Sequence, residues 1–224
     1  YQWSNGQQTE DLLAVKAGSY TVTVTDSNRC VRTLSFVLTE PDSLQLSFTQ
    51  QNVGCKDGNT GSIDLTVSGG TLPYSYIWSN GAVTQDIDHL AAGMYFVKVK
   101  DANGCTDSLQ IVVSQPDLLT LSQVSTNVKC KGDNSGAIDI QVTGGTPPYR
   151  YAWSNNATTP NLTNLSGGIY TLNVTDKEGC AAEIRVVIGE PDSLKLSLSP
   201  ADVDCNGLSS GTILSTVSGG SQPY

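Results

Sequence analysis

Apolar and polar residues alternate with a period of two along much of the chain. Residues 20–24 read Tyr-Thr-Val-Thr-Val, residues 63–67 read Ile-Asp-Leu-Thr-Val, and residues 95–99 read Tyr-Phe-Val-Lys-Val. Because successive side chains of a strand point to opposite faces, this pattern predicts half-buried β-strands. Further strands are expected at 44–48, 74–78 and 109–113, with a short one near 84–87. No segment has the periodicity of a helix.

Turn-forming pairs separate these segments at intervals of roughly ten residues. The pairs are Gly69-Gly70, Asn80-Gly81, Ala92-Gly93 and Asn103-Gly104. Asn-Gly suits the tight turn of a β-hairpin. About seven short strands without a helix predict an all-β protein built from antiparallel β-sandwiches.

The same pattern occurs three times at a step of 75 residues. Trp3, Trp78 and Trp153 follow this step, and so do two sets of three cysteines. A unit of this length can bury a core of its own, unlike the shorter rungs of a solenoid. We therefore expect tandem domains cut from a longer array. The expected parts are the C-terminal part of a truncated repeat (1–41), complete repeats (42–116 and 117–191), and the N-terminal part of a truncated repeat (192–224).

Two aromatic positions indicate an immunoglobulin-like sandwich. A Gly-x-Tyr at the start of a strand resembles a tyrosine corner, in which the phenol bonds to an upstream backbone group; it occurs at Tyr20, Tyr95 and Tyr170. Each tryptophan occupies a position where such sandwiches bury one, so we expect Trp3, Trp78 and Trp153 in the core. The alternative is an aromatic surface for stacking on sugars, formed by Tyr74, Tyr76, Tyr149 and Tyr151 with the tryptophans.

The charge balance excludes two classes of partner. Twelve Lys and Arg stand against 21 Asp and Glu, for a net charge of −9 and a pI near 4.4. Nucleic acid and anionic membrane surfaces would repel such a chain. The longest apolar runs, such as 111–113, are far below the ~20 residues of a spanning helix, so direct membrane insertion is not expected.

These motifs resemble the SprB repeat of very large cell-surface adhesins in Bacteroidota. The segments GSIDLTVSGGTLPYSYIWSNG (61–81) and LAAGMYFVKVKDANGC (90–105) recur as GAIDIQVTGGTPPYRYAWSNN (136–156) and LSGGIYTLNVTDKEGC (165–180). The resemblance implies export by the type IX system, an extracellular location on the outer cell surface, and a role in adhesion and gliding motility.

The six cysteines indicate disulfides and an oxidising compartment. His89 is the only histidine, which disfavours zinc. Three pairings respect the repeat. A hairpin turning near residues 41–44 favours the local pairing Cys30–Cys55, Cys105–Cys130 and Cys180–Cys205. The alternatives are Cys55–Cys105 with Cys130–Cys180, inside each repeat, and Cys55–Cys180, between consecutive repeats.

No set of residues indicates an enzyme. Asp26, Asp101 and Asp176 each precede a tight turn, where Asp caps its own backbone. No cofactor is expected, with calcium as the one alternative to plain turn chemistry. The oxygen donors that would bind calcium are Asp57, Asn59 and Asp64 in one repeat, and Asp133, Asn134 and Asp139 in the next.

An Asp-Ser-Leu triplet occurs three times and resembles the acceptor for protein O-glycosylation in Bacteroidota. Its serines are Ser43, Ser108 and Ser193. Together these features favour a structural role, as a stiff, disulfide-stabilised stalk segment whose partners are neighbouring repeats of the same chain. The alternatives are a carbohydrate-binding module that contacts surface polysaccharide, and a subunit of a multichain filament.

Overall fold

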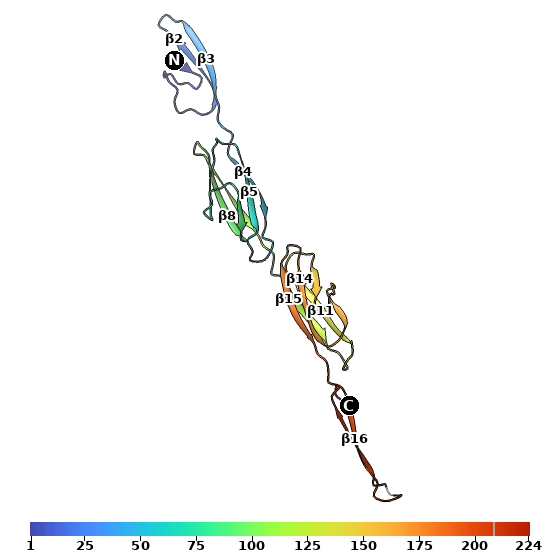
Figure 1. Ribbon diagram of the computed structural model, residues 1–224. Coiled ribbons are helices and arrows are strands. Elements are labelled where there is room, and N and C mark those ends of the chain that lie inside the picture. The colour runs from blue at the N-terminus through green and yellow to red at the C-terminus, as the bar shows by residue number, and fades with distance from the viewer. Residues whose placement is uncertain (208) are drawn as a thin grey trace. The chain divides into compact units, whose positions relative to one another are not determined.

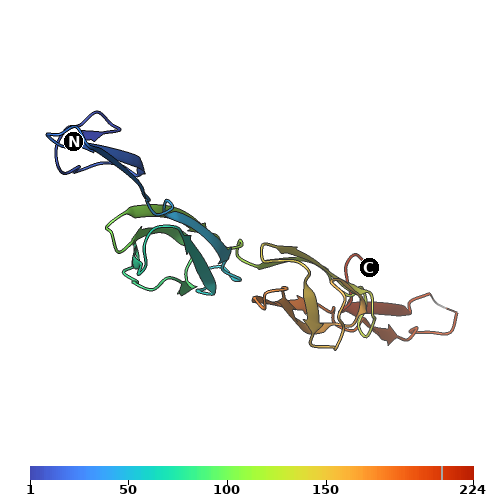
Figure 2. The same ribbon diagram turned by 90° about the horizontal axis from the view of Figure 1, so that it is seen from above.

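The computed structural model describes residues 1–207 and 209–224, and its regular elements there are all β-strands, as Figures 1 and 2 show. The chain divides into two compact units. The first comprises Tyr1–Thr49, Ile63–Ile87 and Tyr95–Ile111, and the second comprises Gln50–Ser62, Asp88–Met94 and Val112–Tyr224. No helix among the described residues is long and apolar enough to cross a membrane.

The second unit contains a complete six-stranded sandwich. Its strands are β10 (Thr120–Thr126), β11 (Gly136–Thr143), β12 (Arg150–Trp153), β13 (Leu162–Leu165), β14 (Gly168–Thr175) and β15 (Ala181–Ile188). They form two antiparallel sheets, ordered β10-β11-β13 and β12-β14-β15. The chain crosses from one sheet to the other between β11 and β12, between β12 and β13, and between β13 and β14. Two antiparallel sheets connected in this way form an immunoglobulin-like sandwich. The repeat therefore has six strands where the sequence pattern suggested about seven.

The core of this sandwich follows the period-two pattern. On β11, Ile138 and Ile140 are buried, whereas Asp139 and Gln141 point to water. Leu172 and Val174 fill the same layer from β14, and Trp153 joins them from β12. Burying each aliphatic side chain of this size contributes roughly 1.5–3 kcal/mol to folding. The alternation in the sequence thus places one apolar face of each sheet inside.

The preceding strands repeat this order 75 residues earlier. They are β4 (Gln45–Gln51), β5 (Gly61–Ser68), β6 (Ser75–Trp78), β7 (Ile87–Leu90), β8 (Gly93–Lys100) and β9 (Thr106–Val113). Their sheets are ordered β4-β5-β7 and β6-β8-β9. The short strand expected near 84–87 begins only at Ile87.

The N-terminal and C-terminal segments each contain part of this set of strands. The first unit begins with one sheet of β1 (Gln2–Trp3), β2 (Gly18–Thr25) and β3 (Val31–Leu38). The second unit ends with a two-stranded sheet of β16 (Lys195–Ala201) and β17 (Thr212–Ser218). In both segments, some positions that are buried in the complete sandwich are exposed to solvent, such as Phe36 on β3 and Ile213 on β17.

Candidate functional site: the disulfide-linked repeat junction

A disulfide joins two consecutive copies of the sequence repeat. Cys55 and Cys180 are bonded with their Cα atoms 5.6 Å apart, although 125 residues separate them in sequence. Cys55 lies between β4 and β5, and Cys180 lies in the turn between β14 and β15. Both belong to the second compact unit. Among the described residues the remaining cysteines are unbonded and exposed: Cys30, Cys105, Cys130 and Cys205.

The favoured local pairing is therefore wrong, and so is the pairing inside each repeat. The local pairing required the chain to form a hairpin around residues 41–44. Instead β3 pairs with β2, while β4 belongs to a different sheet with β5 and β7. The observed bond corresponds to the third alternative. The structure therefore does not form the expected pairs Cys30–Cys55, Cys105–Cys130, Cys180–Cys205, Cys55–Cys105 and Cys130–Cys180.

A buried aspartate holds the turn that carries Cys180. One carboxylate oxygen of Asp176 accepts the backbone N–H groups of Glu178 and Cys180, both at 2.9 Å. The other oxygen accepts the N–H of Thr146 at 2.7 Å, from the loop after β11. Asp176 is 4% exposed, so these bonds replace the water it has lost. The cap thereby fixes the cysteine to the core of its own repeat.

The same cap occurs one repeat earlier. Asp101 accepts the N–H of Cys105 at 2.7 Å and that of Thr71 at 2.9 Å. Burial alone would raise the pKa of Asp101, but hydrogen bonds from the N–H groups of Thr71 and Cys105 outweigh burial and lower it. Asp26 likewise accepts the N–H of Cys30 at 2.7 Å. These aspartates have the turn-capping role that the sequence indicated, and they also orient the cysteine.

Hydroxyl side chains close the loop that carries the other cysteine. The Gly54 N–H donates to Oγ1 of Thr60 at 2.8 Å. The equivalent bonds run from Lys129 to Ser135 and from Asp204 to Ser210, each at 2.9 Å. Sequence reasoning missed these residues, although the recurrence of a hydroxyl side chain at the 75-residue step is a signal that could have found them.

The side chain just before each linker proline, Gln115 before Pro116 and Glu190 before Pro191, accepts a hydrogen bond from the cysteine-bearing loop of its own repeat. We call this contact the clasp. Oε1 of Gln115 accepts the N–H of Asp57 at 2.7 Å. In the next repeat Glu190 accepts the N–H of Gly132 at 2.6 Å, and its second oxygen lies 2.7 Å from Lys131. The hydrogen bond from Lys131 holds the pKa of Glu190 below its ordinary value and raises that of Lys131. The recurrence of an acceptor side chain just before the proline, as Glu40, Gln115 and Glu190, is a signal in the sequence that could have indicated this contact.

A pair of glycines positions the linker itself. Gly145 donates its N–H to the carbonyl of Asp117 at 2.9 Å. Gly144 has φ +71°, and a Cβ on it would lie 2.0 Å from the carbonyl oxygen of Leu118. Only glycine accommodates both the dihedral angle and this close approach. The Tyr149 hydroxyl donates to the carbonyl of Gly144 at 2.7 Å and completes the corner.

A pocket of about 270 Å³ lies at the junction. Both bonded cysteines and the linker residues Asp117, Leu118 and Leu119 line it. The described part of the chain contains no cluster of three or more His, Cys, Asp or Glu residues that could hold a metal ion. The calcium candidates are all exposed: Asp64 and Asp139 lie on β5 and β11, and Asp57, Asn59, Asp133 and Asn134 lie in the loops before these strands. Calcium binding by them stays a prediction.

The tryptophans and corner tyrosines contribute to the architecture. Trp78 and Trp153 are 2% and 4% exposed. Trp3 is half-buried, and the indole N–H of all three donates to the carbonyl six residues downstream at 2.9 Å. The Tyr170 hydroxyl donates to the carbonyl of Ser166, four residues upstream, and Tyr20 does the same with Lys16.

The tyrosines considered as a sugar platform are not free rings on the surface. Tyr149 and Tyr151 are partly buried and pack against the core. The Tyr74 hydroxyl donates to the carbonyl of Gly69 at 2.5 Å, and Tyr76 bonds to Gln85 at 3.1 Å. The hydroxyls of Tyr74 and Tyr76 and the packing of Tyr149 and Tyr151 are thus used within the repeat, and this disfavours the carbohydrate-binding interpretation.

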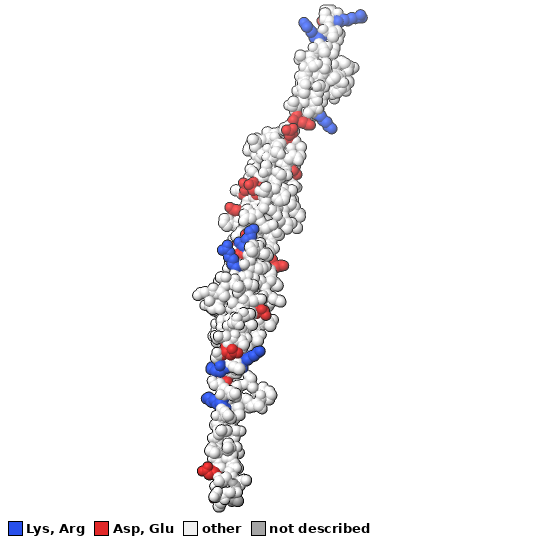
Figure 3. Space-filling view, turned by 90° about the vertical axis from the view of Figure 1, so that its right-hand side faces the viewer, with Lys and Arg blue, Asp and Glu red and all other residues white. Residues whose placement is uncertain are grey.

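The outer surface carries charges of both signs. On the face in Figure 3, acidic and basic side chains are scattered in small groups over a mostly uncharged surface. The serines of the Asp-Ser-Leu triplets, Ser43, Ser108 and Ser193, are all exposed. They are accessible to a modifying enzyme, and their glycosylation stays a prediction.

Comparison with known proteins identifies the repeat. The SprB repeat family matches residues 47–83, 122–158 and 197–224, which confirms the resemblance seen in the sequence. No curated protein matches the chain. The chain thus carries SprB repeats, a module of cell-surface adhesins.

The similar solved structures include immunoglobulin-domain proteins. One holds the N-terminal eight Ig domains of Down Syndrome Cell Adhesion Molecule isoform 1.30.30, at 11% identity and TM-score 0.40, covering 77% of this chain and 28% of that one. Another holds four Ig domains of Dscam1 isoform 9.44, at 14% and 0.32, covering 84% and 63%. An amphioxus IgVJ-C2 molecule matches at 14% and 0.27, covering 65% and 96%. The chain spans less than two thirds of the first two proteins.

Proposed function

We propose that this chain is a spacer segment in the stalk of a large adhesin on the outer surface of a Bacteroidota cell. The observation that carries the proposal is the bond between Cys55 and Cys180, which links one sequence repeat to the next. The capped turn at Asp176 and the clasped loop at Asp57 anchor the two cysteines in their own repeats. Force along the chain would pass through this bond and bypass the residues between the cysteines.

The proposed stalk role assigns no chemistry to the chain. Its partners are neighbouring repeats, its export route is the type IX system, and its parent protein serves adhesion and gliding. The resemblance to SprB repeats supports these finer statements. Detecting the chain with an antibody on intact cells, and losing that label in a strain without the type IX system, would test the location.

Single-molecule stretching tests the mechanical role. With the bond intact, the 125-residue interval between the cysteines is shielded from force. At about 3.6 Å per extended residue, breaking the bond should add roughly 450 Å of extension. A Cys55→Ser, Cys180→Ser double variant should show the longer extension with or without reductant. Equal extension for the oxidised native chain and the double variant would refute the spacer mechanism.

A further inference from the structure

The outer face of one sheet in the first compact unit combines positive charge with apolar side chains. On β8, Phe96, Lys98 and Lys100 occupy alternate positions and are all exposed. The side chains between them, Val97 and Val99, are fully buried. Because successive side chains of a strand point to opposite faces, the phenylalanine and both lysines lie on the face turned away from the core.

A groove of about 280 Å³ lies on this face, and both lysines line it. The register places Ser75 of β6 opposite Lys100, and Ile77 opposite Lys98. Thr106 lines the groove from β9, on the other side of β8. The groove therefore crosses three strands and presents an apolar side chain, two hydroxyls and two ammonium groups. We call it the lysine groove.

The turn between β8 and β9 supports one of these lysines. A Cβ at Gly104 would lie 3.7 Å from Cε of Lys100, so the stem of the lysine lies close to this turn. The stem follows the protein surface while the charged end stays exposed. The Ser75 hydroxyl donates to the carbonyl of Lys100 at 3.2 Å, and its oxygen can still accept a hydrogen bond. Polar groups held in this way lose less freedom when a ligand binds.

The positive charge of the lysine groove is not neutralised by the protein. In the part of the chain that the structure describes, neither Lys98 nor Lys100 forms an ion pair. The described residues that line the groove include no carboxylate. Alternate positions of a strand are about 7 Å apart, and two positive charges at this distance repel each other. A bound anion would remove this repulsion.

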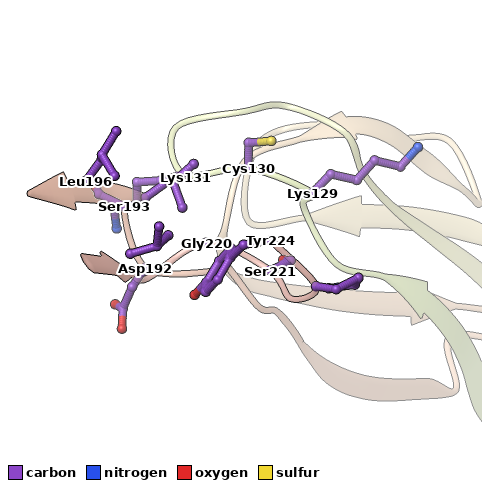
Figure 4. A pocket seen from close by; sticks show the side chains of 12 residues that line it. Lys129, Cys130, Lys131, Asp192, Ser193, Leu196, Gly220, Ser221 and Tyr224 are labelled. Carbon is purple, nitrogen blue, oxygen red and sulfur yellow. The ribbon is translucent and has the colours of Figure 1, made fainter. Parts of the chain in front are cut away.

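Another groove with two lysines differs in this respect. It has a volume of about 690 Å³ and contains Lys129 and Lys131 together with Asp192, as Figure 4 shows. Nζ of Lys131 lies 2.7 Å from Oε2 of Glu190, so its charge is already paired. Two lysines in a groove are therefore not sufficient for an anion site, and the free charge distinguishes the lysine groove.

A neighbouring repeat does not cover this face. The next repeat (117–191) has a junction closed by the disulfide, and there the positions equivalent to Ser75, Ile77, Lys98 and Thr106 are still exposed. These positions are Arg150, Ala152, Asn173 and Ala181. A closed junction thus leaves the outer face of the sheet accessible to a partner.

The combination of an aromatic ring and two lysines belongs to a single repeat. At the positions of Phe96, Lys98 and Lys100, the other copies have Thr21, Thr23 and Thr25, and Thr171, Asn173 and Thr175. Those residues lie on the equivalent strands β2 and β14. The fold therefore does not require the lysines or the phenylalanine at these positions.

We propose that the lysine groove binds an acidic polysaccharide. The ammonium groups of Lys98 and Lys100 pair with carboxylates along the polymer. The hydroxyls of Ser75 and Thr106 form hydrogen bonds with sugar hydroxyls, and the ring of Phe96, which is 45% exposed, packs on the apolar face of a sugar. An extended polymer fits a groove that crosses three strands. This site is separate from the tyrosines considered above and does not depend on the stalk role.

The test measures binding of the full chain to polygalacturonate by calorimetry. Dextran serves as the neutral polysaccharide, and polyglutamate as the acidic peptide. We expect binding to polygalacturonate, no binding to dextran, and binding to polyglutamate that is weaker by about tenfold, because the peptide lacks the sugar hydroxyls. Added salt should weaken binding by screening the lysine charges. No binding to polygalacturonate, or binding to polyglutamate of equal strength, would overturn the proposal.

Two variants take their residues from the next repeat. Lys98→Asn with Lys100→Thr should weaken polygalacturonate binding by about tenfold or more. Phe96→Thr retains every charge and should weaken binding by about threefold. Both variants should keep the unfolding midpoint, because asparagine and threonine occupy the equivalent positions of β14. Native affinity in Phe96→Thr would show that charge alone attracts the polymer, and would contradict a saccharide site.

A matched control removes two lysines elsewhere. Lys129→Asn with Lys195→Thr makes the same substitutions and changes the net charge equally, at the groove of Figure 4 and on β16. This control should bind polygalacturonate with the affinity of the native chain. An equal loss of affinity in the control and in the Lys98→Asn, Lys100→Thr variant would show that net charge governs binding, and the assignment to the lysine groove would fail.

Discussion

The Asp176 carboxylate accepts the backbone N–H of Cys180 at 2.9 Å, and this bond ties the core of one repeat to its junction. Cys180 is bonded in turn to Cys55 of the preceding repeat. Because the same carboxylate also holds the loop at Thr146, the cysteine, the turn and the loop are fixed by one buried group. The junction is thus an extension of the folded core.

Replacing Asp176 should weaken this repeat. Asp176→Ala leaves the N–H groups of Thr146, Glu178 and Cys180 without their acceptor. Unsatisfied buried donors of this kind cost about 1–3 kcal/mol each, so a loss of at least 2 kcal/mol is expected in urea unfolding. The control Asp139→Ala, on an exposed position of β11, should change stability by less than about 0.5 kcal/mol. Similar losses in both variants would contradict the role of the cap.

Stability should fall in acid because of Asp101. Its pKa is lowered from the ordinary value of 3.8, so the folded state keeps the ionised form at a pH where the unfolded chain binds a proton. The contribution is complete above pH 3.8 and is lost as the pH falls through the lowered pKa. Urea midpoints of the native chain should therefore drop below pH 4 more steeply than those of Asp101→Asn. Parallel curves for the two proteins would exclude Asp101 as the cause.

The sequence predicts the strands and core because these depend on local alternation. Ile138 and Leu172 lie where the period-two pattern places them, and Trp153 is buried as expected. The disulfide could not be chosen in the same way, since all three pairings satisfy the 75-residue step. Which two cysteines bond depends on which loops of consecutive repeats lie next to each other. The order of the strands in the sheets determines those neighbours. The clasp at Gln115 is likewise a contact 58 residues away from Asp57.

Breaking the junction disulfide should lower the stability of the chain. The bond closes a loop of 125 residues, for which the chain-entropy model gives roughly 5 kcal/mol. Guanidinium unfolding with and without reductant should show this difference in the native chain. The Cys55→Ser, Cys180→Ser variant should be insensitive to reductant, and a reductant effect in that variant would assign the change to another cysteine.

The clasp at Glu190 should depend on an acceptor oxygen more than on charge. Gln115 performs the same task with an amide oxygen, accepting the N–H of Asp57 as Glu190 accepts that of Gly132. Glu190→Gln should therefore preserve the unfolding midpoint, whereas Glu190→Ala should lower it. Hydrogen exchange at Gly132 provides the local readout, with faster exchange expected only in the alanine variant. Equal acceleration in both would show that the ion pair with Lys131 is what holds the loop.

Replacing each of two glycines with alanine distinguishes the cost of a left-handed backbone angle from the cost of a steric clash with the linker. Gly144 and Gly132 have φ of +71° and +77°. A Cβ on Gly144 would lie 2.0 Å from the Leu118 carbonyl oxygen, whereas a Cβ on Gly132 would have no atom within 4 Å. Gly132→Ala should therefore cost only the left-handed backbone term, about 1–2 kcal/mol. Gly144→Ala should cost more, because the linker must also move away from the turn. Unfolding curves measure both losses, and equal losses would show that the linker is not packed against Gly144.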